Sequence, residues 1–446
     1  MKQPMKRAVL QLAFFSCLLC DIVAQATVRY VDINNPHPAA PYTDWSTAAN
    51  VIQVAIDAAD PGDLVLVTNG VYQSGGHNYS YSIVSRVAIP KLLTVMSVNG
   101  PAVTTILGDV YPHYAWGCRC AWLTNGAVLS GFTLTLGNAT LGPNDVYDRC
   151  GGGVYCMSYL SVVSNCVVMQ NRSSMWGGGA FQGTYINCLF SGNSSGSLGG
   201  GAAYATLINC TAVTNSGASG GGVGACTVKN GIVYANNASS GPSPDWDSSV
   251  FIKSCTTGIS SSGGNITADP LLVNAPAGDF HLGTNSPCIN AGDNAYAPTA
   301  PDLDGNPRIV GGTVDMGAYE FQSPASLISY AWLQQYGLPV DGSADFVDTD
   351  GDGMNNWQEW VCDTDPTNAT SFLQMLSPTT GPSGTSISWQ SVGDRAYFIQ
   401  RATDLSVPSA FQTLVTNVPG QAGTTTFIDT NTTGPGPYFY RVGVWH

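Results

Sequence analysis

The sequence predicts an all-β protein whose largest part is a solenoid of parallel strands with about 22 residues per coil. Three stretches, VVSNCVVMQN, TYINCLFSGN and TLINCTAVTN, carry Asn-Cys at their fourth and fifth places and Asn at their tenth. Charged residues are only 10% of the chain and glycines number 52, which favours strands and turns over helices. Two asparagine series step by 22, 22 and 21 residues: Asn165, Asn187, Asn209 and Asn230, and Asn171, Asn193, Asn215 and Asn236.

In such a solenoid, equivalent residues of successive coils stack roughly 4.8 Å apart. Asparagine suits these positions because it tolerates the left-handed conformation that ends a strand, and because its amide can hydrogen-bond to the asparagines above and below. Glycine triplets, which suit tight corners, begin at Gly151, Gly177, Gly199 and Gly220. Cys166, Cys188 and Cys210 are expected to form an inward column of small apolar side chains.

Three functional interpretations of the cysteine column compete with packing. A zinc site would need a CxxC pair or a nearby histidine. A catalytic thiol would need a histidine partner, but none lies between His113 and His281. A disulfide within the column would have poor geometry, because stacked side chains point the same way. Packing is therefore the interpretation that the sequence favours.

The N-terminus predicts a secretory signal peptide over residues 1–26. Lys2, Lys6 and Arg7 precede an apolar run, and Ala24-Gln25-Ala26 is a cleavage signal. We therefore expect a protein exported to the extracellular space or cell surface. Cleavage leaves eleven of the 13 cysteines, and because this number is odd, at least one cysteine must stay a free thiol. No later stretch is apolar and long enough to span a membrane. The net charge of −14 argues against nucleic acid as a partner and suits calcium.

Segments on both sides of the repeats carry a family resemblance. Four stretches resemble secreted right-handed parallel β-helix proteins of pectate lyase-like fold: IQVAIDAADPGDLVLVTNGVY, LTVMSVNG, LSGFTL and GGGVY. The first of them predicts a short capping helix, a turn and a strand. GGGA and FSGN look like repeats of chlamydial polymorphic membrane proteins. DPLLVNAPAGDFHLGTNSPCINAGDN and DLDGNPRIVGGTVDMGAYEF resemble the closing segment of bacterial β-helix proteins called choice-of-anchor Q. The resemblance implies a right-handed parallel β-helix over residues 27–321, a fold that hosts enzymes, adhesins and proteins of no known activity.

The catalytic patterns of β-helix enzymes are not found in the sequence. The NTD, DD, GHG and RIK elements of polygalacturonases and the WIDH-type element of pectate lyases are missing. Between Asp148 and Asp245 there is no Asp or Glu at all. The central coils are therefore interpreted as a wall, and chemistry is sought in loops that interrupt the period.

Two such loops, residues 108–122 and 138–150, form the candidate binding surface. Aromatic rings can stack on sugar faces, and carboxylates with arginine can hold hydroxyls, uronate or calcium. The candidate glycan-binding residues are Asp109, Tyr111, His113, Trp116, Arg119, Asp145, Tyr147, Asp148 and Arg149. In the alternative interpretation, the aromatics pack around disulfides that staple the two loops through Cys118, Cys120, Cys150 and Cys156.

Two further acidic segments are expected to be structural. Residues of the closing segment should fix turns and cap the last coil: Asp302, Asp304, Arg308, Asp315 and Glu320. The stretch GPSPDWDSSV, with Asp245, Trp246 and Asp247, is expected to be a solvated turn.

Residues 322–371 predict a calcium-binding linker. SLISYAWLQQYG has helical spacing and a glycine stop, and DTDGDGMNNWQE, residues 348–359, matches the calcium-loop template D-x-D-x-D-G-x5-E. The following EWVCDTDPTNATSF resembles bacterial thrombospondin type 3-like linkers, and one clear loop argues against a dockerin, which pairs two. A calcium-stiffened hinge is expected. The predicted ligands are Asp348, Asp350, Asp352, the carbonyl of Met354, Asn356 directly or through water, and Glu359.

Residues 372–446 alternate apolar and polar residues between Gly and Pro turns, which predicts a small β-sandwich similar to fibronectin type III modules. The leading functional expectation is a secreted, monomeric, non-catalytic protein of adhesin type that binds an extracellular polysaccharide or cell-surface glycan. The alternative is a polysaccharide lyase or glycoside hydrolase that acts on acidic polysaccharide through the loops of residues 108–150.

Overall fold

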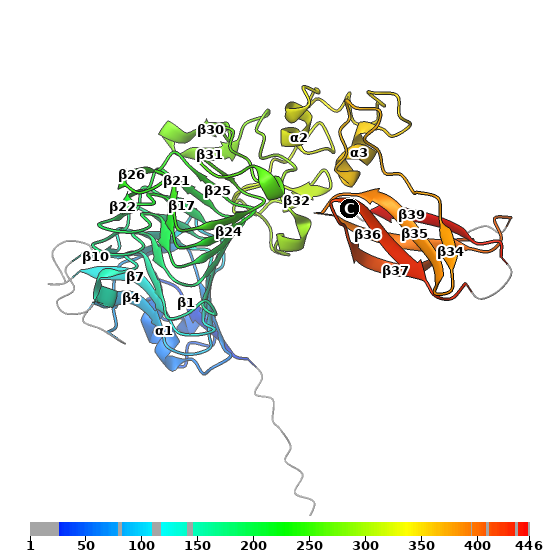
Figure 1. Cartoon of the computed structure of the whole chain (residues 1–446). Helices are drawn as coiled ribbons and strands as arrows, with labels where there is room; N and C mark the ends of the chain where they lie inside the picture. The colour runs from blue at the N-terminus through cyan, green and yellow to red at the C-terminus, as the bar shows by residue number, and fades with distance from the viewer. Residues whose placement is uncertain are drawn as a thin grey trace, which may run out of the picture.

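The computed structural model describes residues 26–78, 83–108, 117–140, 146–393, 395–406, 410–432 and 436–444. These residues form a right-handed parallel β-helix, a linker with two short helices and a β-sandwich, which confirms the predicted fold class (Figure 1). Within the described residues, no helix is long and apolar enough to cross a membrane.

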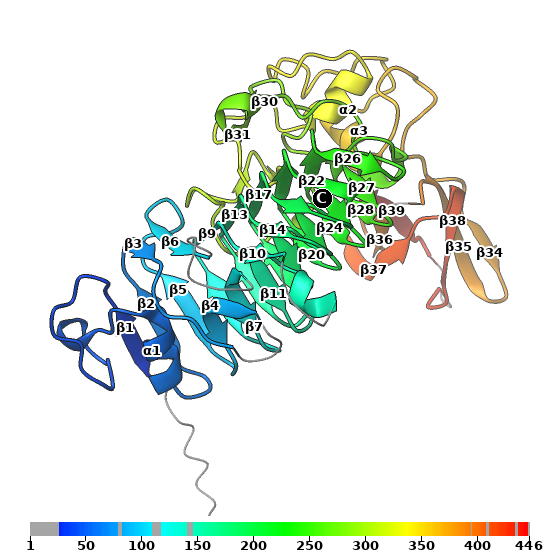
Figure 2. The ribbon, with the colours of Figure 1, turned by 90° about the vertical axis from the view of Figure 1, so that its left-hand side faces the viewer.

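Four parallel sheets form the β-helix walls in the described chain, and their strands stack along one axis (Figure 2). Sheet A contains β1 (Val28–Val31), β2 (Leu64–Val67), β5 (Thr94–Ser97), β8 (Val128–Ser130), β12 (Val162–Ser164), β16 (Thr184–Ile186), β20 (Thr206–Ile208), β24 (Thr227–Lys229) and β28 (Val250–Ile252). Sheet B contains β3 (Gly70–Tyr72), β6 (Thr104–Leu107), β9 (Thr133–Thr135), β13 (Val167–Met169), β17 (Leu189–Ser191), β21 (Thr211–Val213), β25 (Ile232–Tyr234) and β29 (Cys255–Thr256).

Sheet C contains β4 (Val84–Ile89), β7 (Cys118–Leu123), β11 (Val154–Cys156), β15 (Ala180–Phe181), β19 (Ala202–Ala203), β23 (Val223–Gly224) and β27 (Trp246–Asp247). Sheet D contains β10 (Asn138–Ala139), β14 (Arg172–Ser173), β18 (Ser194–Ser195), β22 (Ser216–Ser219) and β26 (Asn237–Ser240). Each central coil runs through sheets C, A, B and D in turn, so identical registers recur and inward side chains such as Val163, Tyr185 and Leu207 stack in one buried core. The predicted capping helix is α1 (Ile52–Ala58), which buries Ile52 and Ile56 against that core.

The two asparagine series have different structural roles. In the first series the φ angles lie between +48° and +51°, as predicted for asparagines at the left-handed ends of strands: Asn165, Asn187, Asn209 and Asn230. The amides of the last three donate to the closing segment: Asn187 Nδ2 to the Pro301 carbonyl at 2.8 Å, Asn209 Nδ2 to the Asp315 carbonyl at 3.0 Å and Asn230 Nδ2 to the Asp293 carbonyl at 2.9 Å. Two of these amides also donate to the preceding asparagine of the series, Asn187 to Asn165 and Asn230 to Asn209. This series therefore docks a segment 63 to 114 residues further along the chain.

The second series forms an internal hydrogen-bonded ladder. Asn171 Nδ2 donates to Asn193 Oδ1 at 3.0 Å, Asn193 to Asn215 at 2.9 Å and Asn215 to Asn236 at 3.0 Å. Here the left-handed conformation belongs instead to the preceding residues, Gln170, Gly192, Thr214 and Ala235. Our prediction of left-handed asparagines is thus correct for the first series and wrong for the second.

Asp245 ends this ladder, so its segment is not the solvated turn we expected. Asp245 is 2% exposed, and its Oδ1 accepts the Asn236 backbone N–H and side-chain amide at 2.9 and 3.0 Å. Its Oδ2 accepts the Thr257 hydroxyl at 2.6 Å. Trp246 is also half-buried and donates its indole N–H to the Thr257 carbonyl. The carboxylate replaces the next asparagine at the point where sheet D ends, while sheets A, B and C continue for one more strand each.

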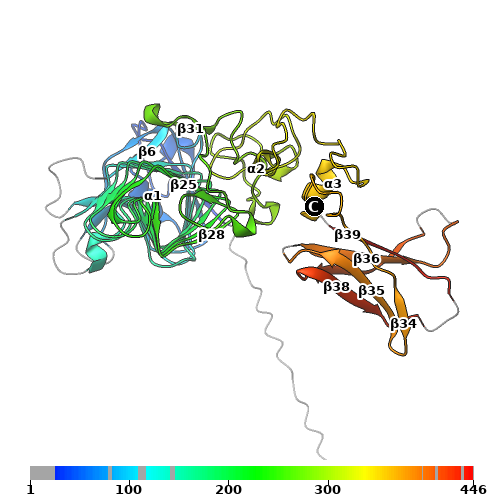
Figure 3. The ribbon, with the colours of Figure 1, turned by 45° about the horizontal axis from the view of Figure 1, so that its top comes forward.

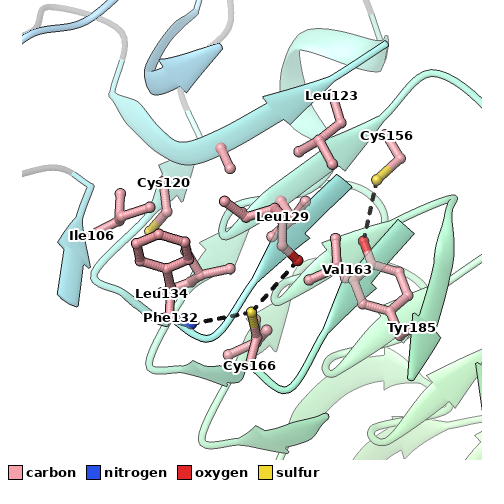
Figure 4. Packing of buried hydrophobic residues seen from close by; sticks show 14 of the residues in the cluster. Ile106, Cys120, Leu123, Leu129, Phe132, Leu134, Cys156, Val163, Cys166 and Tyr185 are labelled. Atoms are coloured by element: carbon pink, nitrogen blue, oxygen red, sulfur yellow. Dashed lines mark hydrogen bonds between the residues drawn. The ribbon is translucent and has the colours of Figure 1, made fainter. Parts of the chain in front are cut away.

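The cysteine column is buried as predicted, with Cys166 and Cys188 fully inaccessible and Cys210 1% exposed. Each thiol also bridges backbone groups at the corner between sheets A and B. In Figure 4 Cys166 Sγ accepts the Phe132 backbone N–H at 3.4 Å and lies 4.0 Å from the Leu129 carbonyl. Cys210 Sγ accepts the Cys188 N–H in the same way. Two coils later, Ser254 Oγ accepts the Gly231 N–H, so serine takes the same role.

The closing segment covers one side of the last coils. It contains two antiparallel hairpins, β30 (Leu272–Asn274) with β31 (Asp279–Leu282), and β32 (Ile309–Val310) with β33 (Thr313–Val314). The 3-10 turns of the described chain are Trp45–Thr47, Val146–Arg149, Ser262–Gly264, Ala275–Ala277 between β30 and β31, and Asn294–Tyr296.

Carboxylates fix the turns of this segment, as we expected. Asp315 accepts the N–H groups of Asn290 and Phe321 at 2.7 and 2.6 Å, and Glu320 accepts those of Val310 and Asp315. Asp302 accepts the N–H groups of Asp304, Asn306 and Glu320. Arg308 donates to the carbonyls of Asp315 and Gly317, so the cluster closes the β-helix.

The linker holds α2 (Tyr330–Gln335) and α3 (Asn356–Cys362), and Figure 3 shows it between the β-helix and the sandwich. Buried Tyr330 packs on the end of the β-helix. In the sandwich, β34 (Thr379–Gly381), β35 (Gly384–Ser391) and β38 (Gly423–Asp429) face β37 (Gln412–Pro419), β36 (Ala396–Ala402) and β39 (Phe439–Val444). Ile387, Trp389, Tyr397 and Ile399 form its core.

Candidate metal centre and loop surface

Three aspartates of the predicted calcium loop converge. The carboxylates of Asp348, Asp350 and Asp352 each place an oxygen within 4.8 Å of the others. The chain turns sharply at Gly351 and Gly353, whose φ values are +83° and +98°. Their N–H groups donate to the two oxygens of Asp348 at 2.8 and 3.0 Å, which holds the loop in this curved shape.

Helix α3 brings a fourth carboxylate to the same place. Asn355 caps the helix and forms a capping box with Gln358, so the helix begins immediately after the loop. Glu359 lies in its first turn and is fully buried. Burial, and then the charges of Asp350 and Asp352, raise the pKa of Glu359 to about 7. Glu359 thus lies close enough to the aspartates for their charges to disfavour its ionised form.

Unsatisfied oxygens test whether a metal ion fits. Asp350 Oδ2, Asp352 Oδ2 and Glu359 Oε2 are buried and receive no hydrogen bond in the part of the chain that is described. Buried carboxylate oxygens normally have a donor or a cation. A set of hard oxygen donors at this density matches the coordination that Ca²⁺ takes in proteins. The residues therefore fit a divalent cation.

Asn356, predicted to bind the ion directly or through water, already has partners for its side-chain amide within the protein, and its role as a ligand stays a prediction. It is fully buried, its Oδ1 accepts the Thr349 hydroxyl at 2.9 Å and its Nδ2 donates to the Ala344 carbonyl at 2.8 Å. The amide thus braces both sides of the loop. Met354 lies beside the cluster with its N–H donated to Asp352 Oδ1 at 2.7 Å, and its carbonyl stays a predicted ligand.

The metal loop links the β-helix side of the linker to the sandwich. On one side the Trp357 N–H donates to the Asp345 carbonyl, and the Asp345 carboxylate accepts the Ser326 hydroxyl at 2.6 Å and the Leu327 N–H at 2.9 Å. On the other side, Arg395 of the sandwich donates to the carbonyls of Val361 and Trp360 at the end of α3. A cation at the loop would therefore stiffen a joint.

The first interrupting loop falls mostly outside the described residues, as do five of the predicted glycan-binding residues: Asp109, Tyr111, His113, Trp116 and Asp145. The structure places the other four, Arg119, Tyr147, Asp148 and Arg149, on or beneath the turn at Val146–Arg149. They come together, but not all of them reach the surface.

Arg119 and Asp148 are buried, which corrects our expectation that they contact a glycan. Arg119 is fully inaccessible and donates to the carbonyls of Cys150, Tyr147 and Asp148 at 3.0, 2.7 and 2.9 Å. Its guanidinium lies 5.1 Å from the ring centre of Tyr155. The arginine therefore fastens the second loop to the β-helix wall.

The disulfide alternative is also not what the structure shows. All eleven cysteines of the described chain are buried thiols, including Cys118, Cys120, Cys150 and Cys156. The loop is held by Arg119 and by aromatic packing. Three aromatic rings occupy equivalent positions of successive coils on the outer face of sheet C, and the loop buries them: Trp122, Tyr155 and Phe181.

Three partly exposed rings surround Phe181, and together with it they form a group that we call the aromatic platform: Tyr147, Trp176, Phe181 and Tyr204. The ring of Phe181 is buried, and its centre lies 6.2 Å from that of Tyr147, 6.0 Å from Trp176 and 5.8 Å from Tyr204. Tyr147 is 40% exposed, and Trp176 and Tyr204 are partly exposed. Sequence reasoning missed Trp176 and Tyr204 because they belong to regular coils, not to interrupting loops.

Comparisons with known proteins give no identity for this chain. No family model and no curated protein matches it. Among solved structures, it is similar to pectate lyase Pel9A, with 14% identity, a TM-score of 0.38, and coverage of 67% of this chain and 97% of that one. It is also similar to the rice weevil pectin methyl esterase, with 13% identity, a TM-score of 0.27, and coverage of 62% and 86%.

Proposed function

We propose that this is an exported, non-catalytic extracellular protein that binds a polysaccharide on its aromatic platform and uses Ca²⁺ to stiffen the joint between β-helix and sandwich. The observation that carries the glycan proposal is the set of partly exposed rings of Tyr147, Trp176 and Tyr204 around buried Phe181. Aromatic faces of this kind supply apolar area for the C–H face of a sugar ring.

The platform is held rigidly by the backbone, which lowers the entropy lost on binding. The Trp176 carbonyl accepts the Gly151 N–H at 2.9 Å and the Ser173 hydroxyl at 3.3 Å. The Met175 N–H donates to the Arg149 carbonyl at 3.0 Å. This bond also places Arg149, which is exposed, beside the rings, where its cation suits an acidic sugar.

Calcium is the proposed occupant of the loop at residues 348–359. The support is the convergence of Asp348, Asp350 and Asp352, whose charges also raise the pKa of Glu359, and three buried oxygens that lack a donor among the described residues. Because α3 contacts the sandwich through Arg395, the ion would act on the position of that domain. Export rests on the signal peptide predicted over residues 1–26.

The glycan proposal is tested by retention on immobilised polygalacturonate, alginate and a neutral glucan, with Ca²⁺ present throughout. Tyr147→Ala and Trp176→Ala should each weaken retention several-fold, since losing about 1 kcal/mol of contact corresponds to roughly a fivefold change. Tyr159→Ala is the matched control, because Tyr159 is a 52% exposed ring of the same β-helix outside the platform.

Each variant is checked by its far-ultraviolet circular dichroism and melting temperature, because Trp176 also covers Phe181. Equal retention of parent, Tyr147→Ala and Trp176→Ala on every polysaccharide that holds the parent would refute the platform. The same samples are assayed for release of unsaturated uronate. Product that disappears in Tyr147→Ala would replace the non-catalytic proposal with the lyase alternative.

A further inference from the structure

The hairpin β30–β31 and the loop at residues 302–306 together cover the outer face of sheet B. Phe280 of the hairpin and Leu303 of the loop pack against Leu189 and Val213 of the sheet, and all four are at most 7% exposed. Residues next to these two apolar anchors point the other way, because alternate residues of an extended segment face opposite sides. They carry the charges that join hairpin and loop.

His281 joins the two segments through both nitrogens of its ring. Nδ1 lies 2.6 Å from Asp279 Oδ1 on the same strand, and Nε2 lies 2.7 Å from Asp304 Oδ2 on the loop. A carboxylate can only accept a hydrogen bond, and a neutral imidazole has one N–H. Two bonds to two carboxylates therefore require the doubly protonated, positively charged ring. The Tyr319 ring lies 4.1 Å from the imidazole and covers one face.

We propose that His281, Asp279 and Asp304 form a pH-operated clasp that fastens the closing loop to the hairpin and loosens when His281 loses a proton. With a neutral ring, one carboxylate loses its donor and faces an imidazole lone pair. When that carboxylate is Asp304, the hairpin loses its hydrogen bond to the loop and keeps its apolar contacts with sheet B. Loosening would uncover Leu189 and Val213, which are otherwise shielded from solvent.

The direction of the pH effect follows from the neighbouring charges. Partial burial disfavours the charged ring, but hydrogen bonds and charge from Asp304 and Asp279 outweigh it and raise the pKa of His281. The stabilisation is therefore present below the pKa of a histidine in the unfolded chain and is lost as the pH rises through the raised pKa. Asp279 shows the reciprocal effect, because its bond to His281 lowers its pKa.

Other groups around the ring do not reverse this direction. Sheet B presents Leu189 and Val213 here, and neither titrates. Burial and the charges of Asp304, Asp279 and Asp302 raise the pKa of Tyr319, so its phenol stays neutral over the range in which histidine titrates. The three side chains of the clasp are each about 45% exposed, so salt should weaken it.

The test follows the imidazole signal of His281 by NMR across a pH titration of the full chain, assigned with His281→Gln. We expect a pKa above that of histidine in an unfolded peptide. We also expect hydrogen exchange at residues 272–282, corrected for the intrinsic pH dependence, to become several-fold faster as the pH rises through that pKa. Asp304→Asn should lower the pKa and remove the pH dependence.

Asp269→Asn is the matched control, because it removes a nearby exposed carboxylate that caps the turn at Leu271 and lies outside the clasp. If the His281 pKa measured in the parent protein equals that of a histidine in an unfolded peptide, this result alone would overturn the proposal. So would hairpin exchange with the same pH dependence in the parent and in Asp304→Asn.

Discussion

In the central coils, residues 149–244, neutral side chains satisfy the buried backbone, whereas carboxylates do so in residues 302–359. The coils contain no Asp or Glu, and their buried polar side chains are mostly asparagines, such as Asn193 and Asn215, which are both fully inaccessible. The C-terminal region instead buries Asp315, Glu320 and Glu359, which are at most 4% exposed. Both regions solve the same problem, the pairing of backbone groups away from water.

The difference follows from repetition. In the asparagine ladder every side chain lies next to an identical one. Two like charges roughly 5 Å apart repel by about 3 kcal/mol at an effective dielectric constant near 20. An amide avoids this cost, since it donates to one neighbour and accepts from the other. A carboxylate is tolerated only where no copy follows, as at Asp245 beneath Asn236. The closing segment and the metal loop occur once, so they can use acids.

The largest expected effect comes from a charge in the middle of the ladder. Asn193 Nδ2 donates to the Val168 carbonyl and to Asn215 Oδ1, so the second oxygen of Asn193→Asp would face two acceptors without a donor. A buried, unpaired charge of this kind should lower the free energy of unfolding by on the order of 3 kcal/mol or more. Denaturant unfolding of the β-helix, followed by circular dichroism, measures it.

Asp245→Asn is the matched control at the end of the same ladder. Its Oδ1 can still accept both bonds from Asn236, and its new amide can donate to the Thr257 hydroxyl, so the loss should be about 1 kcal/mol. If Asn193→Asp were no less stable than Asp245→Asn, repetition would not explain the absence of acids from the coils.

The same contrast separates what could be predicted from the sequence from what could not. The coils and the metal loop are local or periodic patterns, so the asparagine steps and the spacing of Asp348, Asp350 and Asp352 predict their place directly. The sequence could not distinguish the inward from the outward asparagine series, because both follow β-branched strands. The residues that take the left-handed conformation beside the inward series, Gln170, Gly192, Thr214 and Ala235, share no chemical signal.

Contacts between distant segments were beyond prediction. Arg119 looks like a surface ligand in the sequence, but its partners are carbonyls 28 to 31 residues away that appear only once the second loop folds back. Asn356 fits the calcium template by position, yet Thr349 and Ala344 take its amide. The link from Asp304 to His281, 23 residues apart, depends on how the closing loop crosses sheet B.

The metal loop provides the second test, because only there, among the described residues, do buried carboxylate oxygens lack a hydrogen-bond donor. Chelation should make residues 322–372 more sensitive to proteases. An ion at a hundred times its dissociation constant would stabilise the joint by about 2.7 kcal/mol.

Because Glu359, whose pKa is raised to about 7, must be ionised to bind the ion, Ca²⁺ affinity should fall as the pH decreases below that value. Calorimetric titration at several pH values measures this.

Glu359→Gln should show the chelated cleavage pattern at every calcium concentration. Asp341→Asn is the control, since Asp341 is an exposed linker carboxylate that bonds only to nearby Ser343 among the contacts described. It should keep the calcium-dependent protection of the parent. Identical cleavage of the parent with calcium and with chelator would contradict the proposed joint.

The smallest effect concerns the neutral corners of the coils, where cysteine and serine should be interchangeable. Cys210 Sγ accepts the Cys188 N–H and contacts the Ile208 carbonyl, and Ser254 Oγ makes the corresponding bonds to Gly231 and Ile252. Cys210→Ala should cost about 1–3 kcal/mol, because the Cys188 N–H is left without a partner in the core.

Cys210→Ser should lose clearly less than Cys210→Ala in the same unfolding measurement, even though it removes a larger and more polarisable atom. That order distinguishes a thiol that pairs a backbone group from one that only fills space. If alanine were tolerated as well as serine, the column would be packing alone, and the repeating coils would leave an N–H buried without a partner at each of these corners. Such a result would contradict the view that neutral groups in the coils do the same work as carboxylates in the closing segment.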